Sequence, residues 1–212
     1  MPETKKSIDP NYVKYVKERR VFILGAGFSA AAGIPMTGEL LQAAMEKCKK
    51  ECPGFYERIC GYTQAYFDLE DSEPDYTNLS FPEIATYLHY IELREYGGGE
   101  RWNNNGSKEN LALRFYLSKT ICELTPSIEN IPDLYIKFAE QLTAGDIILT
   151  FNWDCLLELC LEKAGQEYSY LQEDNKITIV KLHGSINWRL DKDEETDYQL
   201  NVRFITLLGK RI

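Results

Sequence analysis

Three short polar phrases each follow directly on an apolar run, and they carry the groups best suited to chemistry. The phrases are GAGFS at residues 25–29, FNWD at residues 151–154 and HGS at residues 183–185, and the runs before them are VFIL, IILT and ITIVKL. Such runs are typical of buried strands in a parallel sheet. Ligands of an open α/β sheet bind beyond the carboxyl ends of its strands. We therefore expect the three phrases to line one site.

The glycines of the first phrase make it a candidate for binding phosphate. The pattern G-x-G-x-x-A describes a tight turn between a strand and a helix, and we expect this helix to begin near Ser29. Because glycine has no β-carbon, a diphosphate could approach the N–H groups at the positive end of the helix. The candidate ligands are Gly25, Ala26, Gly27, Phe28 and Ser29. A tight turn also needs glycine for steric reasons alone, so both explanations stay open.

The second phrase offers an amide and a carboxylate. Asn152 comes just past the strand, where its side chain could hold a water molecule or a ribose hydroxyl by donating and accepting at once. Asp154 stands where the following helix needs an N-cap. Capping is the simpler explanation for an isolated aspartate at this position, and ligand binding is the alternative.

The third phrase offers a candidate general base. His183 follows a strand, and an imidazole at that place could accept a proton near neutral pH. Gly184 and Ser185 form a turn that opens access to it. The other histidine, His89, lies within a helical pattern, where we expect it to face a neighbour or solvent. A structural role is likewise the alternative for His183.

Composition narrows the class of protein. The chain has 212 residues, of which 44% are hydrophobic, so it can bury a core and we expect a single domain over residues 1–212. Its net charge of −9 argues against a surface that follows a nucleic-acid backbone. The start shows no secretory signal, and no apolar run has the length of a membrane span. We expect a cytoplasmic protein that binds neither nucleic acid nor membrane.

The cysteines indicate no metal site. The six cysteines form none of the C-x-x-C pairs of a zinc ribbon, and their scatter suits a reducing compartment. Cys155 and Cys160 fall on the helix expected after Asp154. Buried, structural thiols are the interpretation there.

The remaining elements describe an α/β protein with a helical insertion. Strands are expected at residues 21–24, 146–151 and 176–182, and helices at residues 37–50, 81–96, 110–124 and 154–165, the last ended by Gly165. The stretch at residues 61–80 is acidic and loop-like, and Gly/Asn-rich residues 97–107 form another loop. The insertion covers approximately residues 45–125. Strands that alternate with helices predict a Rossmann-like parallel sheet with helices on both faces.

The stretch that follows the glycine phrase, residues 37–50, is predicted to be a helix and not a strand. This prediction argues against a dinucleotide-binding dehydrogenase. Such an enzyme has a second strand ending in an acidic residue that binds a ribose. Here the sequence from Thr37 has apolar residues at helical spacing, with Thr37 as the expected N-cap and Glu39 in the first turn.

Taken together and in order, GAGFSAAAGIP, TFNWD and KLHGS resemble the three signatures of the sirtuins. The signatures are a GAG-x-S turn leading to GIP, then N-x-D after a strand, then HG. The resemblance organises the chain from Val21 to Trp188.

The chain departs from the deacylase sirtuins in two ways. It has Met36, Thr37 and Gly38 where those enzymes continue with Asp-Phe-Arg, and it lacks their zinc ribbon. It is more similar to the sirtuin-like NAD hydrolases of bacterial anti-phage defence, which share GAGFS, GIP-x-x-x-x-L, F-N-W/Y-D and HGS-x-x-W.

This resemblance implies an activity and a set of roles. NAD⁺ would be cleaved to nicotinamide and ADP-ribose, without a metal, to deplete the NAD of an infected cell. Asn152 and His183 would be catalytic, and residues 25–29 would surround the diphosphate. Asp154 and the turn of Gly184 and Ser185 would surround the riboses.

Two alternatives remain beside the hydrolase, and a partner is expected. The chain could be an NAD-dependent protein deacylase, or a module that binds NAD or ADP-ribose without catalysis. The sirtuin G-T-S phrase that holds the adenosine is missing after Trp188, so either the chain continues further or another subunit completes the pocket. The short length and apolar tail favour a regulatory partner protein from the same defence operon or a homo-oligomer.

Overall fold

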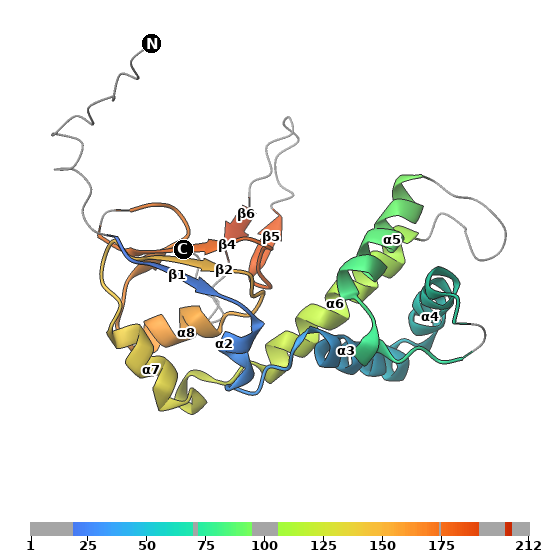
Figure 1. Cartoon of the computed structure of the whole chain (residues 1–212), viewed down its shortest axis with the longest axis horizontal. Helices are drawn as coiled ribbons and strands as arrows, with labels where there is room; N and C mark the ends of the chain where they lie inside the picture. Colours follow the sequence, from blue (N-terminus) through green and yellow to red (C-terminus); the bar gives the residue numbers. More distant parts are fainter. Residues whose placement is uncertain (1–18, 70–71, 95–105, 174, 191–201, 205–212) are drawn as a thin grey trace, which may run out of the picture.

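The computed structural model describes residues 19–69, 72–94, 106–173, 175–190 and 202–204. Residues 97–105 of the predicted Gly/Asn loop and most of the tail after Trp188 lie outside these ranges. Within them, a sheet with its helices stands beside a group of longer helices (Figure 1).

A four-stranded parallel sheet forms the first part. Its strands are β1 (Val21–Leu24), β2 (Ile147–Thr150), β3 (Tyr168–Ser169) and β4 (Ile177–Lys181), in the order β1-β2-β4-β3. In the register, Leu24 pairs with Thr150 and Thr150 with Lys181. The α/β fold with a parallel sheet is confirmed, and β1, β2 and β4 end side by side as neighbours.

Three helices lie along one face of this sheet. They are α2 (Ala26–Ala30), α7 (Asp133–Glu140) and α8 (Leu156–Lys163) (Figure 1). Alternate strand side chains point toward them, so Ile148 and Ile179 are buried. Val21 and Ile23 point to the other face, where they are 56% and 69% exposed among the described residues.

Four longer helices follow α2: α3 (Thr37–Glu51), α4 (Pro53–Phe67), α5 (Phe81–Leu93) and α6 (Gly106–Leu124). They cover the stretch predicted as an insertion, approximately residues 45–125, but the first of them begins earlier, at Thr37. These helices enclose their own buried cluster, which includes Leu41, Ile59, Leu88 and Leu113. The insertion therefore stabilises itself by burying apolar side chains apart from those that cover the sheet.

Several local predictions were wrong. Residues 61–67, the first third of the stretch interpreted as loop, belong to α4, because Pro53 favours a helix start and Tyr56, Ile59 and Tyr62 are buried at helical spacing. The N-cap of α3 is Met36 rather than Thr37, and it makes no side-chain cap. Strand β3 and helix α7 were not expected.

Short elements complete the described chain. They are the 3₁₀ turns η1 (Tyr76–Asn78) and η2 (Ile128–Asn130), and an antiparallel pair of β5 (Trp188–Leu190) with β6 (Val202–Phe204). In the ranges that the structure covers, no helix combines the length and apolar character needed to cross a membrane.

Candidate active site

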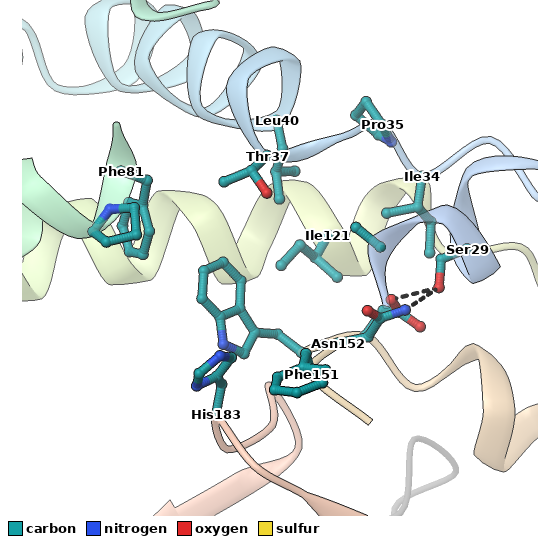
Figure 2. Close-up of a pocket in the computed structure, with 14 residues that line it drawn as sticks. Ser29, Ile34, Pro35, Thr37, Leu40, Phe81, Ile121, Phe151, Asn152 and His183 are labelled. Carbon is teal, nitrogen blue, oxygen red and sulfur yellow. Dashed lines mark hydrogen bonds between the residues drawn. The ribbon is translucent and has the colours of Figure 1, made fainter. Parts of the chain in front are cut away.

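The site lies where the carboxyl edge of the sheet meets the helical insertion. A cavity of about 290 Å³ opens there. From the sheet side it is lined by Ala26, Ser29, Phe151, Asn152, Asp154 and His183. Figure 2 shows Leu40, Phe81 and Ile121 reaching it from the insertion. All three strand-end phrases thus reach one cavity, as the order of the strands requires.

A chain of hydrogen bonds joins the first two phrases. The amide nitrogen of Asn152 donates to the hydroxyl of Ser29 at 2.9 Å, and that hydroxyl donates to Asp154 Oδ2 at 2.8 Å (Figure 2). Ser29 is 1% exposed. Because the nitrogen of the Asn152 amide is bound to Ser29, its oxygen is turned away from Ser29 and is free to meet a ligand.

The N-cap of α8 is Cys155 rather than Asp154, but the side chain of Asp154 still binds an amide at the start of this helix. Its Oδ1 accepts from the backbone N–H of Leu156, the first residue of α8, at 3.0 Å. Its other oxygen accepts from Ser29, and the residue is 7% exposed. Asp154 therefore holds Ser29 in place and satisfies a helix end, while it still borders the cavity.

His183 stands at the other end of the cavity from Ser29 (Figure 2). Its imidazole lies 5.4 Å from the ring of Phe151, tilted by 50°. It is exposed, and no hydrogen bond ties it to any residue in the described ranges. Both ring nitrogens are therefore available to a ligand.

Gly184 and Ser185 lie on a second cavity that adjoins the first. Gly184 has φ +81°, which lets the chain turn directly after His183. The turn is tied to the FNWD phrase, because Ile186 N and Ser185 Oγ both donate to the carbonyl of Trp153, at 3.0 and 3.3 Å. Neither Gly184 nor Ser185 lines the first cavity, so the placement lends no support to their expected contact with the riboses of a ligand bound there.

The two glycines of the first phrase leave open space. Gly25 has φ −118°, which any residue adopts, and Gly27 lies within α2. A β-carbon built at either position would meet no described atom within 4 Å. The steric explanation for these glycines therefore finds no support, and room for a ligand explains them better.

Two details of the first phrase differ from expectation. Helix α2 begins at Ala26, so Ser29 lies inside it rather than at its start. Phe28 packs into the core, 5.1 Å from the ring of Tyr135, and its backbone N–H and carbonyl are bonded to Gly25 and Tyr135. Phe28 thus contributes packing and offers no free group to a diphosphate.

A buried ion pair beneath the site was missed by the sequence interpretation. Lys181 Nζ donates to Glu158 Oε1 at 2.9 Å and to the carbonyl of Asp154 at 2.5 Å, and both charged side chains are almost fully buried. Tyr170 also donates to Glu158, and burial followed by this charge raises the pKa of Tyr170 well above its usual range. The sequence did hold a signal for this ion pair, because Lys181 occupies an inward-facing position of the apolar run ITIVKL.

The cysteines next to the site are structural. Cys155 and Cys160 are 1% and 0% exposed, and burial raises the pKa of each thiol to about 12. Their expected burial is confirmed. In the part of the chain that the structure describes, no three His, Cys, Asp or Glu side chains gather as a metal site would need.

No protein-family model matches the chain, and no curated protein matches it significantly. The fold and the site define the class by themselves: a Rossmann-like α/β protein with a helical insertion and, at the carboxyl edge of its parallel sheet, a largely apolar cavity that also holds polar side chains.

Proposed function

We propose that this protein is an NAD⁺ glycohydrolase, which cleaves NAD⁺ to nicotinamide and ADP-ribose. One observation carries the proposal. Asn152 and His183, from the ends of different strands, border the same cavity as Ala26 and Ser29 of the first phrase. A β-carbon at Gly25 or Gly27 beside them would meet no described atom within 4 Å. The sirtuin-like order of the three phrases supports the same activity.

The reaction needs few protein groups. The bond between C1′ of the ribose and the nicotinamide nitrogen breaks, and its electron pair neutralises the pyridinium. Water adds to C1′ and releases one proton, so NAD⁺ and water give nicotinamide, ADP-ribose and H⁺. Because the leaving group is already cationic, no general acid is required. The protein must stabilise a positively charged ribose and position a water molecule.

Asn152 and His183 fit these two tasks. The oxygen of the Asn152 amide is the negative end of a fixed dipole, since Ser29 holds the nitrogen. It can stabilise the cationic ribose or accept from a ribose hydroxyl. His183 can accept the proton of the attacking water. Apolar walls from Ile34, Leu40 and Ile121 limit other water and strengthen both interactions.

The diphosphate would lie against the glycine turn. The N–H groups of Ala26 and Gly27 stand at the amino end of α2, beside the open space. Asp154 acts on the ribose through Ser29 and Asn152, since both of its oxygens already accept hydrogen bonds.

The resemblance to anti-phage effectors supplies the proposed setting. We infer a cytoplasmic protein that depletes NAD in an infected cell once a partner protein or self-assembly activates it. An effector of this kind must stay inactive until triggered.

The test is nicotinamide release from NAD⁺ in the absence of any acylated peptide. The chain is assayed alone and together with the products of neighbouring genes, as wild type, Asn152→Ala and His183→Ala. Each variant should lose activity about 100-fold or more. His89→Ala is the matched control, because this histidine lies on α5 away from the cavity, and it should keep wild-type activity.

Three outcomes would contradict the proposal. If Asn152→Ala and His183→Ala both bind NAD and cleave it at the wild-type rate, neither residue has the catalytic role assigned to it. Turnover only with an acyl-lysine peptide would make the chain a deacylase. Tight NAD binding without nicotinamide release, even in the assembled complex, would make it a binding module.

A further inference from the structure

A second cavity of about 400 Å³ adjoins the first, and Trp153 lines both. The two cavities share only Phe81, Ile121, Trp153 and His183. Figure 2 shows Phe81 and His183 at the end of the first cavity that is remote from Ser29. The second cavity therefore lies beyond His183, away from the glycine turn.

The charge of this second cavity is unusual for the chain. Arg114, from α6, lines it, and no carboxylate does, although the sequence holds 33 acidic residues. No ion pair ties Arg114 to a carboxylate within the described ranges. The guanidinium of Arg114 faces no carboxylate in this lining, so a ligand that balances its charge is an anion.

The rest of the lining suits a flat ring. Phe81, Trp153 and Trp188 supply aromatic surface, and the hydroxyls of Ser118 and Ser185 supply polar contacts. The Trp188 ring lies beside Gly184, where an added β-carbon would come within 3.8 Å of it. Aromatic walls bind planar rings by stacking, and a guanidinium binds phosphate through paired hydrogen bonds.

We propose that the second cavity binds a nucleotide, with its phosphate on Arg114 and its base against the aromatic walls. This nucleotide is a separate molecule from the NAD of the first cavity. Ala26 and Ser29 line only the first cavity, and Arg114, Gly184 and Ser185 line only the second, with His183 between the two sets.

The nucleotide would act on the first cavity through His183 and Trp153, which border both. Its bound form contacts the imidazole from the side away from Asn152, so it changes the rate of NAD turnover. That effect rests on the proposed function, whereas binding itself does not.

The test measures AMP binding to the full chain by calorimetry and by quenching of tryptophan fluorescence. Adenosine and inorganic phosphate are measured beside it, and each should bind at least about tenfold more weakly than AMP, because each fills half of the site. Arg114→Ala should weaken AMP binding about tenfold or more. Ala85→Phe, which fills the cavity from α5 without changing charge, should do the same.

Two controls separate this site from the first cavity. Lys137→Ala removes one exposed positive charge on α7 and should leave AMP affinity unchanged. Asn152→Ala should also leave it unchanged. Thermal melting of each variant confirms that it is folded.

Unchanged AMP affinity in folded Arg114→Ala would overturn the proposal, and so would equal affinity for adenosine and AMP. Loss of AMP binding in Asn152→Ala, or displacement of AMP by NAD, would place the nucleotide in the first cavity instead. All of these measurements are binding affinities and none uses nicotinamide release. The nucleotide site can therefore fail its test while the proposed hydrolase activity passes its own, and the reverse.

Discussion

The amide nitrogen of Asn152 lies 2.9 Å from the hydroxyl of Ser29, although the two residues are 123 positions apart in the sequence. The bond joins the helix after β1 to the end of β2. It fixes which end of the Asn152 amide faces the cavity. Ser29 is in turn held by Asp154 at 2.8 Å, so three residues from two phrases form one oriented unit.

Ser29→Ala should therefore lower the rate of NAD turnover by positioning alone. Without the hydroxyl, the Asn152 amide can rotate, and the dipole that meets the ribose is no longer fixed. We expect kcat to fall about 10- to 100-fold with a smaller change in KM. The variant should also lose about 1–3 kcal/mol of stability, because Asp154 Oδ2 is left buried without its donor. Steady-state kinetics and urea unfolding measure the two effects.

Ser118→Ala is the matched control for this change. It makes the same chemical change, serine to alanine, at a residue of α6 that lines the second cavity. This variant should keep the wild-type kcat when NAD is the only ligand. Full activity in Ser29→Ala would show that the orientation of Asn152 does not depend on the bond.

Gly27→Ala should separate ligand binding from folding. The added methyl meets no described atom within 4 Å, and alanine favours a helix over glycine by about 1 kcal/mol. We expect an unchanged or higher melting temperature together with weaker NAD binding, since the methyl enters the space before the turn. Calorimetric titration with NAD and thermal melting give both values.

Gly38→Ala provides the opposite case. A β-carbon at Gly38 would clash with the backbone carbonyl of Thr77, so this variant should lose stability. If Gly27→Ala instead unfolds the protein and Gly38→Ala does not, the packing around both glycines is other than described.

The strands of the site could be predicted because each is a short apolar run that ends at a polar phrase. VFIL, IILT and ITIVK correspond to β1, β2 and β4, and their parallel order places three phrases at one edge. The parallel direction of the strands was therefore enough to predict that Ser29, Asn152 and His183 lie at one cavity.

What the sequence did not reveal depends on contacts between distant residues. The orientation of Phe28 toward the core follows from Tyr135, and the target of Lys181 is a glutamate on α8. Neither pairing leaves a local pattern. Helix α4 was missed for a different reason, because its polar and aromatic residues give a weak apolar period until Ile59 and Tyr62 are seen to be buried.

Lys181→Met should destabilise the protein more than most single changes. It leaves Glu158 charged and buried, and it frees the carbonyl of Asp154 that Lys181 now binds. Breaking a buried pair in this way costs about 3–5 kcal/mol. Replacing both partners, as in Lys181→Met with Glu158→Leu, should recover a large part of that loss, since no unpaired charge remains. Urea unfolding of the two single variants and the double variant measures the coupling. Additive losses would contradict it.

The ion pair of Asp146 with Arg20 predicts a stability that depends on pH. Asp146 is 3% exposed and accepts from Arg20 Nη2 at 2.5 Å and from Thr143 N at 2.7 Å. Burial acts to raise the pKa of Asp146, but the bonds from Arg20 and Thr143 outweigh it, and the pKa is lowered.

A carboxyl whose pKa is lower in the folded protein stabilises it above the pKa of the unfolded chain, about 3.9 for aspartate. That contribution is lost as the pH falls through the folded value. Asp146→Asn should therefore be less stable than wild type at neutral pH, and the difference should shrink as the solution is acidified past the unfolded pKa. Free energies of unfolding from urea titrations across this range measure it. The exposed Glu57→Gln on α4 is the control, with only a small difference from wild type at every pH. A gap between Asp146→Asn and wild type that stays constant down to the acid limit would mean that Asp146 stabilises the fold by packing and not by its charge.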